Sequence, residues 1–166
     1  MKLESLAPCH FDMLFEFECD NKAWFEQYVP ARPESYSQYA SFVTAQLALL
    51  EEQCCETSLF LVLIDENRIA ARVNFTNIEE AECELGYRVG QAYVNGGIAT
   101  QAVHDSLLVA QQQLDLRLVY AKAATNNPAS IRVLEKSGFS RTKQRPKLIR
   151  LNEDVLKLAH FELSLK

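Results

Sequence analysis

The stretch YVNGGIAT, residues 93–100, decides how the rest of the chain is interpreted. It lies between a run typical of a strand, Cys83–Val89, and one typical of a helix, Ile98–Leu114. Its adjacent glycines, Gly96 and Gly97, let the backbone approach a ligand closely because they carry no Cβ. The helix that follows would offer unpaired N–H groups and the positive end of its dipole. The pattern therefore indicates a phosphate or pyrophosphate site, although an ordinary strand-to-helix turn would use the same residues.

The second informative stretch is NNPASIRVLEKSGF, residues 126–139. Asn127 suits an N-cap, Pro128 suits the first helical position, and Gly138 suits the left-handed residue that ends a helix. The sequence thus predicts a short capped helix, entered from a strand at Leu118–Ala123. Its expected core-facing side chains are Ile131, Val133 and Leu134, and its expected solvent-facing ones are Arg132, Glu135 and Lys136. Taken alone, a capped surface helix requires no chemistry.

In this order, the two stretches resemble the GNAT superfamily of N-acetyltransferases, and within it the RimJ/RimL-like group that acetylates protein N-termini, ribosomal proteins included. The superfamily loop (Gln/Arg)-x-x-Gly-x-(Gly/Ala), which holds the acetyl-CoA pyrophosphate, matches residues 94–99, with Val94 where Gln or Arg is usual. The group's Glu-x-Gly-Tyr motif is present as Glu84–Tyr87, and Asn-x-x-Ser-x-x-Val-Leu-Glu-Lys-x-Gly-Phe is present as Asn127–Phe139. Weaker likeness includes Tyr28–Pro33 and the C-terminal strands, so the resemblance spans nearly the whole chain.

The order of the elements is also that of the superfamily, which implies an α/β fold. We expect a single GNAT-like domain over residues 1–166, with a mixed, mostly antiparallel sheet flanked by helices. Apolar spacing and turn signals predict an element order of one strand, helices, three strands, a helix, a strand, a helix and two strands. The expected segments not given above are the strands Lys2–Leu6, Ser58–Ile64, Arg68–Phe75 and Leu158–Leu165, the helices Phe11–Cys19 and Ser35–Gln53, and a loop or broken helix at Trp24–Pro33.

The resemblance also assigns catalytic roles. Glu84 is the first candidate for the base that takes a proton from the acceptor amine, and Glu82, on the same strand face, is the second. Many members have a tyrosine as general acid where this chain has Leu134, so the serine of the Asn-x-x-Ser motif, Ser130, becomes the candidate donor to the thiolate. Either carboxylate could equally be an ordinary group on the wet face of a sheet. Likewise, Ser130 could serve only as a local backbone partner.

Acetyl-CoA is the expected co-substrate, and no metal is expected. Backbone N–H groups near Arg88–Val89 would stabilise the oxyanion, and Asn127 would bond the pantetheine arm. The loop itself has no Lys or Arg, so Arg88, Arg132 and Lys136 are the nearest sources of positive charge, unless they are ordinary solvated side chains. The expected cofactor-binding residues are Tyr87, Arg88, Val89, Val94, Asn95, Gly96, Gly97, Ile98, Ala99, Thr100, Asn127, Ser130 and Lys136.

The composition argues against several classes of binding partner and cofactor. The net charge of −5 argues against a general nucleic-acid binder, because phosphate neutralisation dominates such affinity. No apolar run reaches the length of a membrane span and Met1–Pro8 lacks a signal-peptide layout, so a cytoplasmic location is expected. Five cysteines without a C-x-x-C pair argue against zinc and a disulfide framework and favour buried, reduced thiols. The basic run Arg141–Arg150 could be a solvated loop, or could contact the CoA 3′-phosphate or an acidic partner such as the ribosome.

The resemblance therefore implies an enzyme that transfers acetyl from acetyl-CoA directly to a primary amine, with a protein N-terminus of the ribosomal type preferred. A small-molecule amine or polyamine remains an alternative acceptor. A second class of function is an acyl-CoA sensor that has kept the fold and lost catalysis, for which the missing tyrosine and Val94 are the best support. The sequence is compatible with both a monomer and an oligomer.

Overall fold

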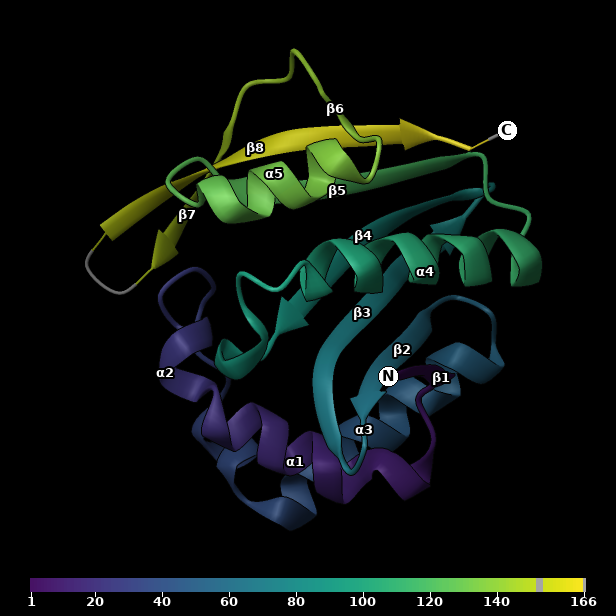
Figure 1. Cartoon of the computed structure of the whole chain (residues 1–166), viewed down its shortest axis with the longest axis vertical. Helices are drawn as coiled ribbons and strands as arrows, with labels where there is room; N and C mark the ends of the chain where they lie inside the picture. The colour runs from purple at the N-terminus through teal and green to yellow at the C-terminus, as the bar shows by residue number, and fades with distance from the viewer. Residues whose placement is uncertain (152–153, 166) are drawn as a thin grey trace.

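The structure is a computed structural model that describes residues 1–151 and 154–165. Its strands form one eight-stranded sheet in the order β1-β2-β3-β4-β5-β8-β6, with β7 paired to β8 (Figure 1). The strands are β1 (Lys2–Ser5), β2 (Leu59–Asp65), β3 (Arg68–Glu79), β4 (Glu82–Val89), β5 (Leu118–Ala124), β6 (Ser140–Arg141), β7 (Lys147–Leu151) and β8 (Asp154–Ser164). The helices are α1 (Phe11–Asp20), α2 (Lys22–Phe25), α3 (Tyr39–Cys54), α4 (Ile98–Gln113) and α5 (Pro128–Lys136).

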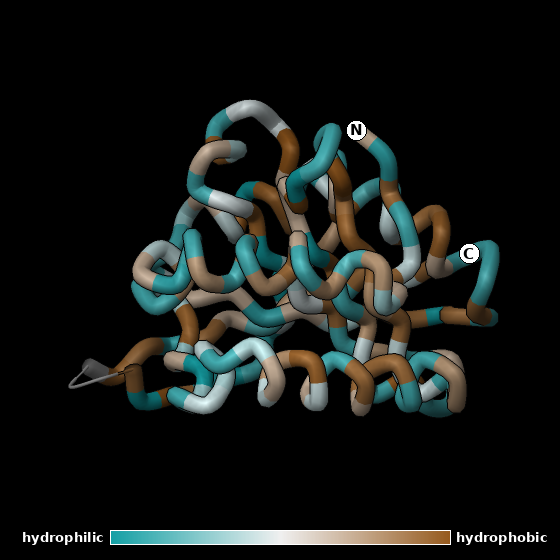
Figure 2. Tube along the Cα trace, turned by 90° about the horizontal axis from the view of Figure 1, so that it is seen from below, coloured by the Kyte–Doolittle hydropathy of each residue, from teal (hydrophilic) through white to brown (hydrophobic). Residues whose placement is uncertain are grey.

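Two apolar clusters hold helices against opposite faces of the sheet. The first lies under α4 and α5 and includes Leu61, Phe75 and Leu134 (Figure 1). The second lies under α1 and α3 and includes Phe42 and Phe60. Strand β2 contributes to both clusters, which explains its nearly continuous apolar sequence. Along the helices, apolar and polar residues alternate in Figure 2, as expected where one face packs on a sheet.

The sheet has an opening next to the parallel pair β4–β5. All other paired strands are antiparallel, but β4 and β5 run parallel and pair only from Glu82–Leu85 to Leu118–Ala121. Beyond that point β4 continues to Val89 against β3, and β5 continues to Ala124 against β8. The two strands therefore separate and leave an opening in the middle of the sheet.

The expected α/β fold and its mostly antiparallel sheet are confirmed, but the C-terminal part differs from the prediction. Three strands follow α5 instead of two, because residues 147–151 pair with β8. Strand β8 begins at Asp154, four residues before the expected start at Leu158. The basic run Arg141–Arg150 is accordingly not a single loop: its two ends belong to β6 and β7. Pairing with β8 overrides the polar local sequence here.

The expectation of buried cysteines is wrong for four of the five thiols. Only Cys83 is buried, in the cluster under α4, and burial raises the pKa of its thiol to about 12. The exposed thiols are Cys9, Cys19, Cys54 and Cys55. Cys54 is the last residue of α3 and Cys55 is its C-cap. Along the described residues, no helix has both the length and the apolar character needed to cross a bilayer.

Candidate active site

A cavity of about 390 Å³ occupies the opening between β4 and β5. Tyr87 and Val89 line it from β4, and Lys122 lines it from β5. Residues from both faces of the sheet complete the walls. On the side of α4 and α5 these are Val94, Ala99, Asn127, Ala129, Ser130 and Val133, and on the side of α1 and α2 they include Trp24, Phe25, Tyr28, Val29 and Pro30. The cavity can therefore receive one reactant from each face.

The glycine loop at the entrance to α4 has the backbone of an anion site. Asn95 and Gly97 adopt left-handed conformations, with φ of 64° and 78°, and Gly97 is the N-cap of α4. Among the described residues, no acceptor takes a hydrogen bond from the backbone N–H groups of residues 95–100. These donors, together with the helix dipole, favour a phosphate group. Val94 and Ala99 reach the cavity wall, whereas the expected ligands Asn95, Gly96, Gly97, Ile98 and Thr100 lie beyond it.

Helix α5 and strand β4 each bring one hydroxyl to the cavity. The side chain of Asn127 accepts a hydrogen bond from the Ser130 N–H over 3.1 Å and so caps the helix, as predicted. The Ser130 Oγ lies 2.8 Å from the Tyr87 hydroxyl, which also donates to the Ser130 carbonyl over 3.1 Å. Burial raises the pKa of Tyr87 to about 12. Tyr87 thus stays protonated at neutral pH, and its single O–H can donate either to the Ser130 carbonyl or to the Ser130 Oγ. Leu134 is fully buried.

Glu84 lies behind the cavity wall. Its carboxylate accepts a hydrogen bond from Lys122 Nζ over 2.6 Å, and it is Lys122 that lines the cavity. Glu84 lies instead in a shallow acidic depression on the sheet with Glu79, Glu80, Glu82 and Tyr120. Sequence reasoning missed Lys122, because its partnership with Glu84 depends on the parallel register of β4 and β5.

Arg88 does not bring its charge to the glycine loop. Its guanidinium turns to the opposite face, where it donates to Glu18 over 2.7 Å and stacks 5.0 Å from the ring centre of Phe25. Burial lowers the pKa of Arg88, and the Glu18 charge opposes that shift. Glu18, which sequence reasoning also missed, has a side chain only 5% exposed. Arg88 still lines the cavity, beside Val89.

The other two candidate cations are surface residues on α5. Arg132 is exposed and its Nε donates to the Pro128 carbonyl over 3.3 Å. Lys136 is exposed in the last turn of α5 and is not part of the cavity wall. Neither side chain therefore reaches the cavity. In the part of the chain that the structure describes, no three His, Cys, Asp or Glu side chains gather closely enough to hold a metal ion.

Comparison with known proteins identifies relatives of this chain. The family model described as an acetyltransferase (GNAT) domain matches residues 1–140. A curated relative, the [ribosomal protein uS5]-alanine N-acetyltransferase of Escherichia coli K12, is 25% identical over 134 residues, which cover 77% of this chain and 69% of the relative.

Two solved structures share the fold. The ribosomal-protein-S5-alanine acetyltransferase of Vibrio fischeri superposes with a TM-score of 0.91 at 18% identity, covering 98% of this chain and 91% of that one. RimL, a ribosomal L7/L12 alpha-N-protein acetyltransferase in complex with coenzyme A, superposes with a TM-score of 0.89 at 18% identity, covering 98% and 93%.

Proposed function

Because this chain belongs to the GNAT acetyltransferase family, we propose that it transfers the acetyl group of acetyl-CoA directly to a protein N-terminal amine, of the ribosomal-protein type. The observation that carries the proposal is the cavity between β4 and β5, which has walls from both faces of the sheet. Acetyl-CoA would enter from the side of α4, and the amine from the side of α1 and α2. The E. coli relative, which is named for acetylation of ribosomal protein uS5, supports the choice of acceptor and a cytoplasmic location.

On the cofactor side, the pyrophosphate would bind the unpaired N–H groups of residues 95–100 at the start of α4. No cationic side chain of the loop assists, so backbone donors and the helix dipole supply the attraction. The pantetheine arm would follow the cavity wall past Val94 and Asn127. This path would bring the thioester toward Ser130 and the backbone of Arg88 and Val89.

The reaction needs a neutral amine and a proton for the leaving thiolate. The amine nitrogen attacks the thioester carbonyl, the oxyanion accepts hydrogen bonds from backbone N–H groups of β4, and the C–S bond then breaks. Ser130 would give its proton to the thiolate sulfur and take one from the Tyr87 hydroxyl, 2.8 Å away, and Tyr87 would then regain a proton from solvent. Glu84 would take the amine proton through water, because Lys122 lies between its carboxylate and the cavity.

The test is incubation of the protein with isotopically labelled acetyl-CoA and a panel of acceptors, read by mass spectrometry and by release of free CoA thiol. The panel contains peptides with free and blocked N-termini, peptides with an internal lysine, and spermidine. The proposal predicts label on the free α-amine. Label on spermidine alone would favour a polyamine acceptor, whereas CoA binding without thiol release from any amine would favour a sensor.

A further inference from the structure

A second, smaller cavity adjoins the first on the side of α1 and α2. Its volume is about 50 Å³, and its walls include Glu18, Arg32 and Tyr36. The two cavities share four wall residues, namely Phe25, Val29, Pro30 and Arg88. The small cavity is therefore next to the place where the acceptor amine would lie, and across the sheet from the glycine loop at α4.

Three guanidinium groups surround the carboxylate of Glu18. The distances from its oxygens are 2.7 Å to Arg88, 3.5 Å to Arg72 and 3.9 Å to Arg32. One carboxylate thus faces three cations, and the Glu18 and Arg72 side chains are only 5% and 3% exposed. The charged side chains in the wall of the small cavity are three cations, Lys22, Arg32 and Arg88, and two anions, Glu18 and Glu26. Buried charges are tolerated when they are paired, so the excess of positive charge favours a further anion.

Two of these arginines have donors left for a ligand. Arg72 uses its Nε on the Asn74 side chain and is not part of the small cavity's wall. Arg88 donates to Glu18 through one terminal nitrogen, and among the described residues no hydrogen-bond acceptor is found for Arg32. Each guanidinium carries five N–H groups. Arg32 is held 5.0 Å from the ring centre of Tyr36 and keeps 41% of its side chain exposed, so it can meet a ligand at the entrance.

We propose that the small cavity is a carboxylate subsite for the acceptor. The acceptor would carry an acidic side chain at its second residue, next to the reactive amine, and that carboxylate would bind Arg32 and the free donors of Arg88. Guanidinium and carboxylate match in a two-bond geometry, which gives direction as well as attraction. This inference rests on the proposed N-terminal acetyl transfer and narrows its substrate class.

The experiment compares two peptides that differ only at the second residue, Ala-Asp and Ala-Asn, each followed by the same neutral sequence. Their affinities for the protein with CoA are measured by titration calorimetry, which requires no turnover. We expect the acidic peptide to bind about tenfold more tightly, the size typical of a charge-assisted pair. Arg32→Gln should bring the ratio of affinities close to one, and Arg32→Lys should leave it between the two values.

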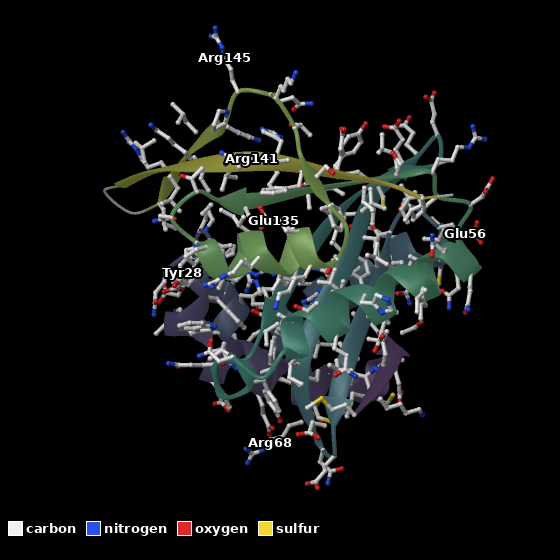
Figure 3. All side chains as sticks on the ribbon, turned by 45° about the horizontal axis from the view of Figure 1, so that its top comes forward. Tyr28, Glu56, Arg68, Glu135, Arg141 and Arg145 are labelled. Atoms are coloured by element: carbon white, nitrogen blue, oxygen red, sulfur yellow. The ribbon has the colours of Figure 1, made fainter. Side chains whose placement is uncertain are left out.

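Arg68→Gln is the matched control, because Arg68 is an exposed arginine at the start of β3, outside both of these cavities (Figure 3). It should keep the wild-type ratio. Equal affinities of the two peptides for the wild type would overturn the subsite, and so would a ratio that survives Arg32→Gln. Thiol release is measured in parallel with both peptides. Failure of transfer with an intact affinity ratio would count against the proposed function alone.

Discussion

Ser130 and Tyr87 offer the proton that the leaving thiolate needs, through hydroxyls 2.8 Å apart. Replacing Ser130 by alanine should lower kcat about 100-fold, the lower range for loss of a positioned general acid, with a small effect on the KM for acetyl-CoA. The measurement is steady-state thiol release. Ser137→Ala, the same change at the other end of α5, is the control and should leave kcat unchanged. Equal kcat for Ser130→Ala and wild type would remove Ser130 from the proton path.

The pH dependence of the same reaction tests the state of Tyr87. Burial raises its pKa to about 12, so the hydroxyl stays protonated in the folded protein until pH approaches that value. Tyr87→Phe should therefore lower kcat uniformly between pH 6 and 9 without moving the limbs of the pH–rate profile. A shift of the alkaline limb in this variant would mean that Tyr87 titrates in the working range, contrary to its burial.

The assignment of the base rests on two neighbouring glutamates. Glu84→Gln should lower kcat about 100-fold near neutral pH while leaving CoA affinity unchanged, because the amide cannot accept the amine proton. Glu82→Gln is the matched variant on the same strand face and should retain activity. A loss confined to Glu82→Gln would transfer the role of base to Glu82. Thiol release and CoA titration together give both quantities.

Individual residues also show which contacts could be predicted from the sequence and which could not. Local signals were sufficient for the Asn127 cap, because a cap involves residues three apart. The partners of Glu84 and Arg88 are 38 and 70 positions away in the chain, and only the folded sheet and α1 bring them together. Lys122 and Glu18 were missed for that reason, although each changes what its partner can do.

At the scale of elements, helix α5 depends on its N-cap. Asn127→Ala should lower the free energy of unfolding by about 1 kcal/mol, since the Ser130 N–H loses its acceptor. Urea denaturation measures the change. The adjacent Asn126→Ala serves as control, because Asn126 is exposed and is not the cap residue. Equal destabilisation by both changes would show that the cap contributes nothing specific.

The entrance to helix α4 requires glycine at a single position. Gly97 has φ of 78°, and forcing alanine into that region should cost about 1–2 kcal/mol of stability and raise the KM for acetyl-CoA. Gly96→Ala is the comparison. Its φ lies outside the left-handed region, and the nearest atom to an added Cβ is 3.8 Å away. Equal effects of the two changes on stability and KM would contradict this account of the turn.

Elements differed in how well the sequence predicted them. Helices α4 and α5 begin where expected, because glycine, Asn127 and Pro128 act within one turn. Strand β7 was missed because two of its five residues, Lys147 and Arg150, are basic, although its partners in β8 are only 3 to 11 positions away in the chain. At this end of the chain, Arg145 projects outward from the segment that joins β6 to β7 (Figure 3).

At the scale of the whole molecule, thiol accessibility reports on global unfolding. Iodoacetamide should label Cys9, Cys19, Cys54 and Cys55 in the folded protein and reach Cys83 only when the sheet opens. Burial raises the pKa of Cys83 to about 12, so both access and thiolate content are low there. Intact mass after timed labelling gives the count, and denatured protein, which should take five labels, is the control. Rapid labelling of all five thiols under native conditions would contradict the core described for β4.

The motifs were enough to predict the family and the α/β fold, because strand and helix signals are local and the motif order is specific. They could not predict that β4 and β5 separate after four paired positions, or that the resulting cavity has walls from both faces of the sheet. These features depend on backbone direction and on where α1 and α2 pack. The side of the cavity formed by α1 and α2 was thus the part of the site that the sequence predicted least well.

The β4–β5 pairing is also the short connection between two halves of the sheet. Strands β1–β4 form one hydrogen-bonded half and strands β5–β8 the other, and a four-residue parallel seam joins them. A molecule lodged in the opening touches Tyr87 on one half and Lys122 on the other. A bound molecule would therefore add contacts between the two halves of the sheet, which β4 and β5 join over only four paired positions.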